Sequence, residues 1–337
     1  SDTHSFPTRR SSDLDRTHEL LESCGNPERA FPSVHVAGTN GKGSVCAMIA
    51  SVLTEAGFKT GLYTSPHIEK FKERIRIDGE PISDEDIVRL AEMLFPVSDK
   101  ISGTFFEITT VMAFKYFAEN DVDIAIVETG LGGRFDSTNV LDPMLAIITP
   151  IGIDHTKYLG NDLASIAFEK AGIIKPDSKV IIADTNQEIK HVFNKAIKKN
   201  NAQSIRLKRN ISGSVVSFNS DLSMNVDLGA KGWSIKNLRC ELAGEHQLRN
   251  IKTAYLAVKE LEKEFTGLEL HLAAGISNIS RNTGFRARIE LIGTSPPVVV
   301  DVAHDPTALS FLVDTLNKSG YEDMKWNIIF TAMKDKD

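Results

Sequence analysis

A glycine-rich stretch between an apolar run and a helical pattern constrains the fold of this 337-residue chain more than any other feature. Residues 33–38 read SVHVAG, which is typical of a strand buried on both faces of a parallel sheet. TNGKGS follows, and apolar residues then recur at helical spacing up to Gly57. A strand, a glycine-rich loop and a helix in this order predict one βα unit of a parallel sheet.

The same alternation of strands and helices continues along the chain. Strands are predicted within 122–130, 145–155 and 178–184, and helices at about 84–95, 105–119 and 161–175. A short helix over 20–29 precedes the first strand, while the stretch from 203 to 240 has the short alternating runs of an antiparallel section, and a helix over 247–265 follows it. We therefore expect an α/β fold with a mostly parallel sheet and a small antiparallel section.

The two ends of the chain do not fit this pattern. Residues 1–14, SDTHSFPTRRSSDL, have no hydrophobic period and resemble translated sequencing adapter, so we leave them out of the predicted fold. A new strand pattern begins at Val298, but a parallel-sheet domain needs roughly 100 residues. We expect one domain over 15–290, followed over 291–337 by the start of a Rossmann-like domain that is cut short.

Composition excludes several classes of protein. The chain is 41% hydrophobic and 25% charged with a net charge of −6, which argues against a protein that coats nucleic acid or an anionic membrane. No apolar run reaches the ~18 residues of a membrane helix. Three widely spaced cysteines imply neither a disulfide framework nor a zinc site. We expect a cytoplasmic enzyme without a nucleic-acid or membrane partner.

The glycine-rich loop has the character of a phosphate-binding loop. Its glycines let the backbone wrap closely around an anion, the helix N-terminus supplies N–H groups, and a lysine adds a mobile charge. The spacing is one residue shorter than the common P-loop form, and a glycine separates the lysine from the serine. The alternative is a simple turn with one exposed lysine. The candidate residues are Gly38, Thr39, Asn40, Gly41, Lys42, Gly43 and Ser44.

Polar residues also stand at the ends of three other predicted strands. Ligands of open parallel sheets bind beyond the carboxyl ends of the strands, and Mg²⁺ prefers oxygen ligands. Ser44, Ser65 and Glu128 would suit one magnesium ion, and His155 could take a second. Glu128 could instead cap the next loop, and His155 could be a hydrogen-bonded core residue.

Together these motifs resemble the folylpolyglutamate synthase and dihydrofolate synthase family of the Mur ligase superfamily. The matching stretches are HVAGTNGKGS (35–44), YTSPHIEKFKERI (63–75), TFFEITT (104–110), VETGLGGRFDSTN (127–139), IGIDHTKYLG (151–160), IAFEKAGIIK (166–175), GEHQLRN (244–250) and FTAMKDKD (330–337). The resemblance implies a monomeric P-loop enzyme of Mur-ligase type. Such an enzyme joins L-glutamate to dihydropteroate or a reduced folate, using ATP and Mg²⁺, through an acyl phosphate.

The resemblance also implies roles for single residues. Lys42 would contact the β- and γ-phosphates, Ser65 and Glu128 would hold the first Mg²⁺, and His155 the second. Lys170 matches a lysine that relatives often carry as a carbamate, which would support the second metal. The loop 64–75 would close on the pterin side. Further nucleotide-binding positions in the later part of the chain are Asn250, Arg288, Asp301 and His304, with Arg288 reaching the phosphates.

Two positions depart from the family pattern. Ala287 stands where the family usually has glycine, which leaves open whether Arg286 or Arg288 is the matching arginine. Asp305 stands where asparagine is usual and would repel a nucleotide unless it is paired. A non-catalytic nucleotide-binding fragment and a Mur-type cell-wall peptide ligase are therefore kept as alternatives. For the 337 residues alone we expect weak ligase activity or none.

Overall fold

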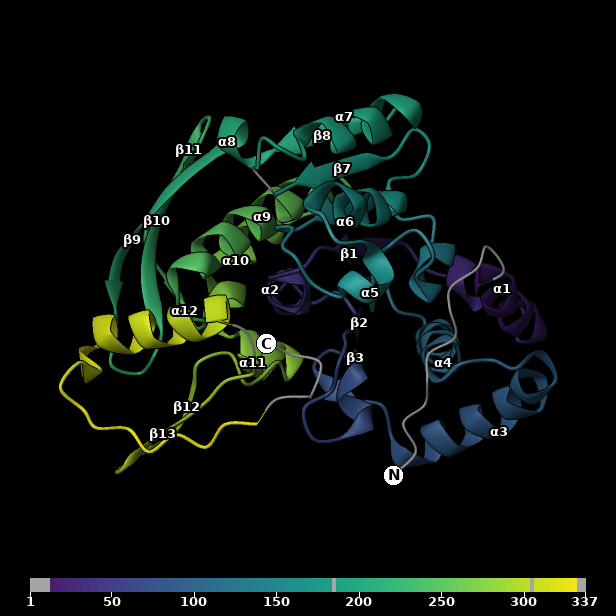
Figure 1. Cartoon of the computed structure of the whole chain (residues 1–337), viewed down its shortest axis with the longest axis horizontal. Coiled ribbons are helices and arrows are strands. Elements are labelled where there is room, and N and C mark those ends of the chain that lie inside the picture. The colour runs from purple at the N-terminus through teal and green to yellow at the C-terminus, as the bar shows by residue number, and fades with distance from the viewer. Residues whose placement is uncertain (1–12, 184–185, 304–305, 332–337) are drawn as a thin grey trace. The chain divides into compact units, whose positions relative to one another are not determined.

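The computed structural model describes residues 13–183, 186–303 and 306–331, which form two compact units (Figure 1). The first unit comprises the chain up to Cys46 and residues 57–206, and the second comprises 47–56 and the chain from Leu207. Helix α2 (Lys42–Glu55) contributes residues to both. Of the adapter-like residues 1–14, the first twelve lie outside the described part, whereas Asp13 and Leu14 begin helix α1 (Asp13–Ser23). The predicted limit at 290 falls inside the second unit, and the domain limits stay a prediction.

An eight-stranded sheet in the first unit confirms the predicted α/β fold with a mostly parallel sheet. The strand order is β4-β3-β2-β5-β1-β6-β7-β8, and the six strands from β2 to β8 run parallel while β3 and β4 pair antiparallel at one edge. The central strand β1 is buried along its whole length. The strands are β1 (Ser33–Ala37), β2 (Thr60–Tyr63), β3 (Ile75–Ile77), β4 (Glu80–Pro81), β5 (Ile124–Glu128), β6 (Leu145–Ile148), β7 (Lys179–Ile182) and β8 (Gln203–Arg206).

Two apolar clusters join the helices of the first unit to this sheet. One contains side chains of α1 (Asp13–Ser23), α3 (Asp84–Ile101) and α4 (Phe105–Glu119) together with β2, β3 and β5. The other contains side chains of α6 (Leu163–Lys170) and α7 (Lys190–Lys199) together with β1, β6 and β7. Both clusters contain residues of the inner strands of the sheet. Their close packing holds these strands in place, and with them the carboxyl ends from which the polar loops emerge.

The helix ends follow from local sequence. Ser83 caps α3 by accepting a hydrogen bond from the Asp86 N–H. The helix predicted over 20–29 instead ends at Ser23, because Gly25 and Asn26 both adopt left-handed backbone angles, and a separate 3₁₀ turn follows. The left-handed conformation stops a helix because it cannot continue the i to i−4 hydrogen bonds.

The second unit contains the predicted antiparallel section as a three-stranded sheet. Its strands β9 (Ile211–Phe218), β10 (Met224–Ala230) and β11 (Trp233–Cys240) follow one another as antiparallel neighbours. A hairpin of β12 (Glu290–Thr294) and β13 (Pro297–Val300) contains the start of the strand pattern predicted from Val298. The expected Rossmann-like domain stays a prediction. The helices of this unit are α8 (Leu207–Asn210), α9 (Glu245–Leu261), α10 (Leu268–Ser277), α11 (Ile279–Thr283) and α12 (Pro306–Leu316).

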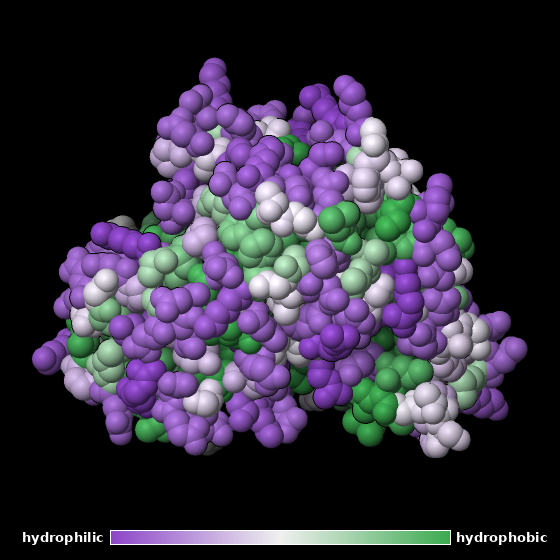
Figure 2. Space-filling view, turned by 180° about the vertical axis from the view of Figure 1, so that it is seen from behind, coloured by the Kyte–Doolittle hydropathy of each residue, from purple (hydrophilic) through white to green (hydrophobic). Residues whose placement is uncertain are grey.

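One face of the protein is mostly hydrophilic (Figure 2). Figure 2 shows polar residues over most of one face, with hydrophobic residues in separate areas between them. Among the described residues no helix is both long and apolar enough to cross a bilayer. The three cysteines, Cys24, Cys46 and Cys240, are free thiols.

Candidate active site

The glycine-rich loop connects the central strand β1 to α2, as predicted. Gly38 follows β1, and a Cβ at this position would overlap the Thr149 hydroxyl oxygen at 1.8 Å, so only glycine fits. Gly41 adopts a left-handed φ of 87°, which glycine accepts without strain. Helix α2 begins at Lys42, so the N–H groups of its first turn have no acceptor within the helix and face any anion at this end.

The first residues of the loop are tied to the neighbouring strand. The N–H groups of Thr39 and Asn40 both donate to the Pro150 carbonyl, at 2.9 and 3.3 Å, and the Thr39 hydroxyl donates to the Gly152 carbonyl. Thr39 and Asn40 belong to the predicted phosphate loop, and here their backbone N–H groups hold the loop against the segment after β6. Helix α2 begins two residues after Asn40.

Glu128 links three of the predicted residues. It ends β5 and is only 4% exposed. Its Oε2 accepts a hydrogen bond from the Ser65 N–H at 3.2 Å, and its Oε1 lies 3.7 Å from the Lys42 Nζ. Ser44, in the first turn of α2, is equally buried. The carboxyl end of the sheet therefore brings a carboxylate, a lysine and the loop after β2 together.

Lys170 is a buried lysine in contact with the phosphate loop. It ends α6, is 4% exposed, and its Nζ donates to the Gly38 carbonyl at 2.6 Å. Burial, followed by repulsion from Lys42, lowers the pKa of Lys170 to about 7, although carboxylates nearby oppose this shift. An amine with this pKa is largely neutral just above pH 7, so it can react as a nucleophile.

His155 lies at the surface of the first unit. Its side chain is 42% exposed and its Nε2 lies 3.4 Å from the Asp154 Oδ2. Its backbone is left-handed, with a φ of 49°, at the start of the short helix α5 (Thr156–Leu159). The alternative of a core histidine is therefore wrong. The neighbouring Asp154 is also one of the carboxylates that act to raise the pKa of Lys170.

Asn250 lies in the second unit on α9. Its Nδ2 donates to the Gln247 Oε1 at 2.8 Å, and both side chains are buried. His246, the residue before Gln247, has its ring centroid 4.8 Å from that of Phe311 with the two planes tilted by 32°, and burial lowers the pKa of His246 to about 4. These polar side chains on one helix match the predicted nucleotide-binding segment in position, but their ligand is not shown.

The two arginines of the linker before β12 make different contacts. Arg286 Nε donates to the Glu290 Oε1 at 2.9 Å, whereas the Arg288 guanidinium lies over the Phe285 ring. Ala287 lies between them with a left-handed φ of 57°. This angle explains why glycine suits the position, since alanine there is strained.

Asp301 holds the same linker from the other side. Its Oδ2 accepts from the Ile289 N–H and its Oδ1 from the Ala303 N–H, both at 2.7 Å. The Asp301 carboxylate therefore has a structural role in this unit, in addition to the nucleotide contact that the sequence predicts for it. The predicted residues His304 and Asp305 lie outside the described residues.

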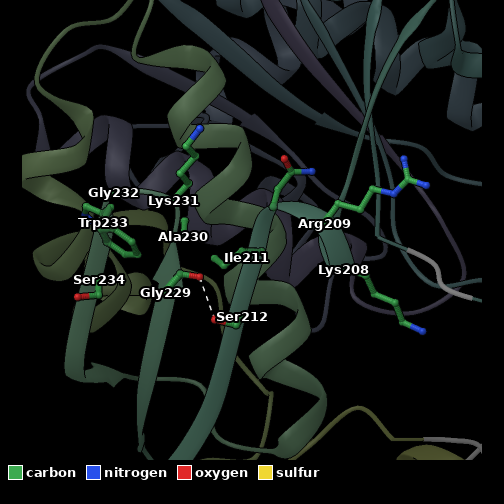
Figure 3. Close-up of a pocket in the computed structure, with 11 residues that line it drawn as sticks. Lys208, Arg209, Ile211, Ser212, Gly229, Ala230, Lys231, Gly232, Trp233 and Ser234 are labelled. Carbon is green, nitrogen blue, oxygen red and sulfur yellow. Dashed lines mark hydrogen bonds between the residues drawn. The ribbon is translucent and has the colours of Figure 1, made fainter.

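A cavity of about 680 Å³ lies in the second unit, and none of the predicted site residues lines it (Figure 3). It is lined by α8, the start of β9 and the β10–β11 turn, including Lys208, Arg209, Lys231 and Trp233. In Figure 3 the three cationic side chains extend in different directions, so they do not converge on one anion. The cavity gives no reason to move the candidate site.

Sequence reasoning missed a buried polar loop beside Lys170. In the stretch GLGGRFDSTN, Asp136 is fully buried and its carboxylate accepts from the N–H groups of Leu131 and Thr138. The Thr138 hydroxyl also contacts His35 Nε2 at 2.8 Å, in the centre of β1. The signal available in the sequence was the run DSTN, because four polar residues between two predicted apolar strands need partners when buried.

No group of three or more histidine, cysteine, aspartate or glutamate side chains that could hold a metal is found in the described ranges. A magnesium site with one carboxylate does not require such a group, since Mg²⁺ keeps waters and binds substrate phosphates. The buried Glu128 carboxylate, which accepts a hydrogen bond from the Ser65 N–H, fits this kind of site.

Comparisons with known proteins agree with this arrangement. The Mur ligase middle domain matches residues 36–258. Dihydrofolate synthase/folylpolyglutamate synthase of Bacillus subtilis is 38% identical over 338 residues, which cover 96% of this chain and 76% of that protein.

Solved structures of related synthases are also similar. A folylpolyglutamate synthase in complex with AMPPCP and folate superposes with a TM-score of 0.84 at 32% identity, covering 93% of this chain and 78% of that one. Folylpolyglutamate synthase of Mycobacterium tuberculosis, complexed with ADP, has a TM-score of 0.79 at 35% identity, covering 91% and 70%. The chain belongs to the folylpolyglutamate synthase and dihydrofolate synthase family of Mur ligases.

Proposed function

We propose that this member of an ATP-dependent ligase family joins L-glutamate to the carboxylate of dihydropteroate or a reduced folate. The observation that carries the proposal is the meeting of Lys42, Glu128 and the Ser65 loop at the start of α2. A lysine, a carboxylate and helix N–H groups at one point suit the phosphates of a nucleotide with a divalent cation. The names of the relatives supply the substrates.

The reaction would proceed in two balanced steps. The substrate carboxylate attacks the γ-phosphorus of ATP, forming an acyl phosphate and releasing ADP. The glutamate amine then attacks the acyl carbon, forms the amide, loses a proton and releases phosphate. Lys42 and the first N–H groups of α2 would hold the phosphoryl oxygens as negative charge develops on them.

Ser44, Ser65 and Glu128 would hold one Mg²⁺ ion. When bound, the ion supplies positive charge to the transferring phosphoryl group. Glu128 suits this role because it is buried at the strand end and its two oxygens face different neighbours. The hydrogen bond from the Ser65 N–H orients the Glu128 carboxylate.

Lys170 would carry the proposed carbamate beside the second metal site at His155. Only the neutral amine reacts with carbon dioxide, and the lowered pKa of Lys170, about 7, makes this form abundant at physiological pH. The amine nitrogen attacks the carbon of carbon dioxide and loses one proton, which leaves an anionic carbamate next to the phosphate loop. We expect ¹³C-bicarbonate to give a carbamate signal that Lys170→Arg abolishes.

An aromatic cluster after β2 would receive the pterin ring. In the loop 64–75, Phe71 packs edge-on against Phe105 at 5.9 Å, and Arg74 lies over the Phe105 ring. Phe105 is 57% exposed, so its ring has a face left for a planar ligand. Phe105→Ala should raise the KM for the pterin substrate more than the KM for ATP.

The proposal is tested by incubating the protein with Mg-ATP, glutamate and either dihydropteroate or tetrahydrofolate, with mass spectrometry of the products. Addition of glutamate that requires ATP supports the proposal, and the two substrates show whether the enzyme acts on one or both.

If neither substrate gains glutamate while ATP still binds, the non-catalytic alternative replaces the proposal, and Ala287 and Asp305 become the first residues to revert. The relatives reported above do not favour the cell-wall peptide ligase. A cytoplasmic location and a monomeric state stay predictions, which gel filtration and fractionation of cells would test.

A further inference from the structure

The loop after β5 and the end of α6 form a tight joint in the first unit. A Cβ on Gly133 would lie 2.9 Å from the carbonyl oxygens of Glu169 and Lys170. A Cβ on Gly172 would lie 2.5 Å from the Cα of Arg134. These contacts are closer than real Cβ atoms tolerate, so both glycines are required for the two segments to approach this closely.

One buried side chain bridges the two segments. The Asn139 Nδ2 donates to the Arg134 carbonyl at 2.9 Å and to the Gly172 carbonyl at 3.2 Å, and the residue is 7% exposed. A carboxamide nitrogen has two N–H donors, and both are used here on backbone acceptors. The Arg134 N–H also donates to the Glu169 carbonyl at 2.8 Å. The joint is therefore held by backbone contacts that the Asn139 amide completes.

The bridging loop is itself anchored to the central strand. Thr138 contacts both the Asp136 carboxylate and His35. Since a carboxylate only accepts, the Thr138 hydroxyl donates to Asp136 and accepts from the His35 Nε2–H. His35 lies in β1, three residues before Gly38. The loop therefore cannot shift without disturbing the strand that leads into the phosphate loop.

These contacts close a ring around Lys170. From β1 they pass through Thr138 and Asn139 to the end of α6, and from there the Lys170 Nζ returns to the Gly38 carbonyl that follows β1. A buried amine on a freely moving helix end would sample several positions. The ring restricts Lys170 to one of them, against the phosphate loop.

We propose that Asn139 is a positioning residue of the ligation reaction, which holds the end of α6 so that the Lys170 amine stays against the Gly38 carbonyl. Asn139 touches no substrate in this proposal and acts through Lys170. The kinetic part of the inference rests on the proposed function, whereas its structural part can be measured without turnover.

The first test is the reactivity of the Lys170 amine toward acetic anhydride, read by peptide mass spectrometry on the whole chain. Asn139→Asp keeps the size of the side chain but places a carboxylate oxygen against two carbonyl oxygens, so both hydrogen bonds are lost. We expect Lys170 to be labelled roughly tenfold faster, because one to two hydrogen bonds contribute a free energy of this order. Asn120→Asp is the matched control, because Asn120 Nδ2 donates to the Tyr116 carbonyl at the end of α4. Equal labelling of Lys170 in wild type and Asn139→Asp overturns the proposal.

A second variant keeps the test decisive if Asn139→Asp does not fold. Gly133→Ala pushes the same joint apart by sterics and leaves Asn139 in place, so it should raise Lys170 labelling as well. Gly229→Ala is its control, because a Cβ there meets only the Ser212 Oγ, at 3.3 Å. Labelling that rises equally in Gly133→Ala and Gly229→Ala would count against a specific joint.

The kinetic test separates positioning from binding. In the ligation assay, Asn139→Asp should lower kcat about 10- to 100-fold while the KM for ATP changes less than about twofold, since a displaced group acts on the chemical step. A raised KM with unchanged kcat contradicts the proposal. If the wild type itself forms no product, the proposed function fails, and the Lys170 labelling still decides whether the joint exists.

Discussion

Two regions of this chain hold their charged side chains in opposite ways. At the carboxyl end of the parallel sheet, Glu128 and Lys170 are each only 4% exposed and each contacts a neighbouring loop. Around the cavity of the antiparallel sheet, Lys208, Arg209 and Lys231 are exposed and have no ion pair with the residues that the structure describes.

The predicted site therefore coincides with buried charges, whereas the cavity is lined by exposed ones. Removing a charge from water costs several kcal/mol unless partners compensate. Such a cost at Glu128 and Lys170 is reasonable where the charges act on a ligand. An exposed lysine carries no such cost, so its presence beside a cavity tells little about function. Four predictions test this contrast.

The largest effect is expected from Lys42→Ala. Removing this cation from the Glu128 end of the sheet should lower ATP cleavage about 10²- to 10³-fold, because the charge that develops on the phosphoryl oxygens loses a preorganised partner. Release of inorganic phosphate measures the rate, and Lys208→Ala serves as the control from the other region. An unchanged kcat in Lys42→Ala would refute the phosphate-loop assignment.

A pH-dependent effect is expected from Lys170→Met. The pKa of Lys170 is about 7 in the fold and 10.5 when the amine is exposed. Below pH 7 the protonated amine is buried, which lowers the free energy of unfolding of the wild type, and this loss disappears as the pH rises toward 10.5. The variant should therefore gain most in free energy of unfolding, relative to wild type, below pH 7. Urea unfolding at pH 6 and pH 10 measures the difference, and a gain that is equal at the two pH values, or larger at pH 10, would show that the pKa is not lowered.

A smaller effect is expected from Ala287→Gly in the linker. Because Ala287 has a φ of 57°, glycine should relieve strain and stabilise the protein by about 0.5–1 kcal/mol. Gly284→Ala is a matched control, since Gly284 has a φ of 63° and alanine should destabilise there. Thermal unfolding of the two variants measures both changes. Opposite signs are expected, and equal signs would contradict the assignment of strain.

The smallest effect is expected at the cavity of the antiparallel sheet. Lys208→Ala and Lys231→Ala remove exposed charges, so each should change the free energy of unfolding by less than about 0.5 kcal/mol and leave ATP cleavage unchanged. The same unfolding and phosphate-release assays apply. A loss of activity in either variant would make this cavity part of the function and break the contrast between the two regions.

The sequence alone predicted the alternation of strands and helices, the phosphate loop from Gly38 to Ser44 and the antiparallel section after residue 203. These features have local causes: the period of apolar residues, glycines at turns, and the order of strand, loop and helix. Ser65 and Glu128 could also be placed at one sheet edge, because parallel strands end on the same side. Local patterns were sufficient for these predictions.

Only the tertiary structure decided which groups are buried together. Lys170 and Gly38 are 132 residues apart in the chain, yet the fold brings them into contact. The same fold buries the Lys170 amine, and this burial lowers its pKa. The use of the Thr39 and Asn40 N–H groups on Pro150 is likewise a contact between distant segments. Burial and hydrogen bonding between such segments depend on how helices pack on the sheet, which no local pattern records.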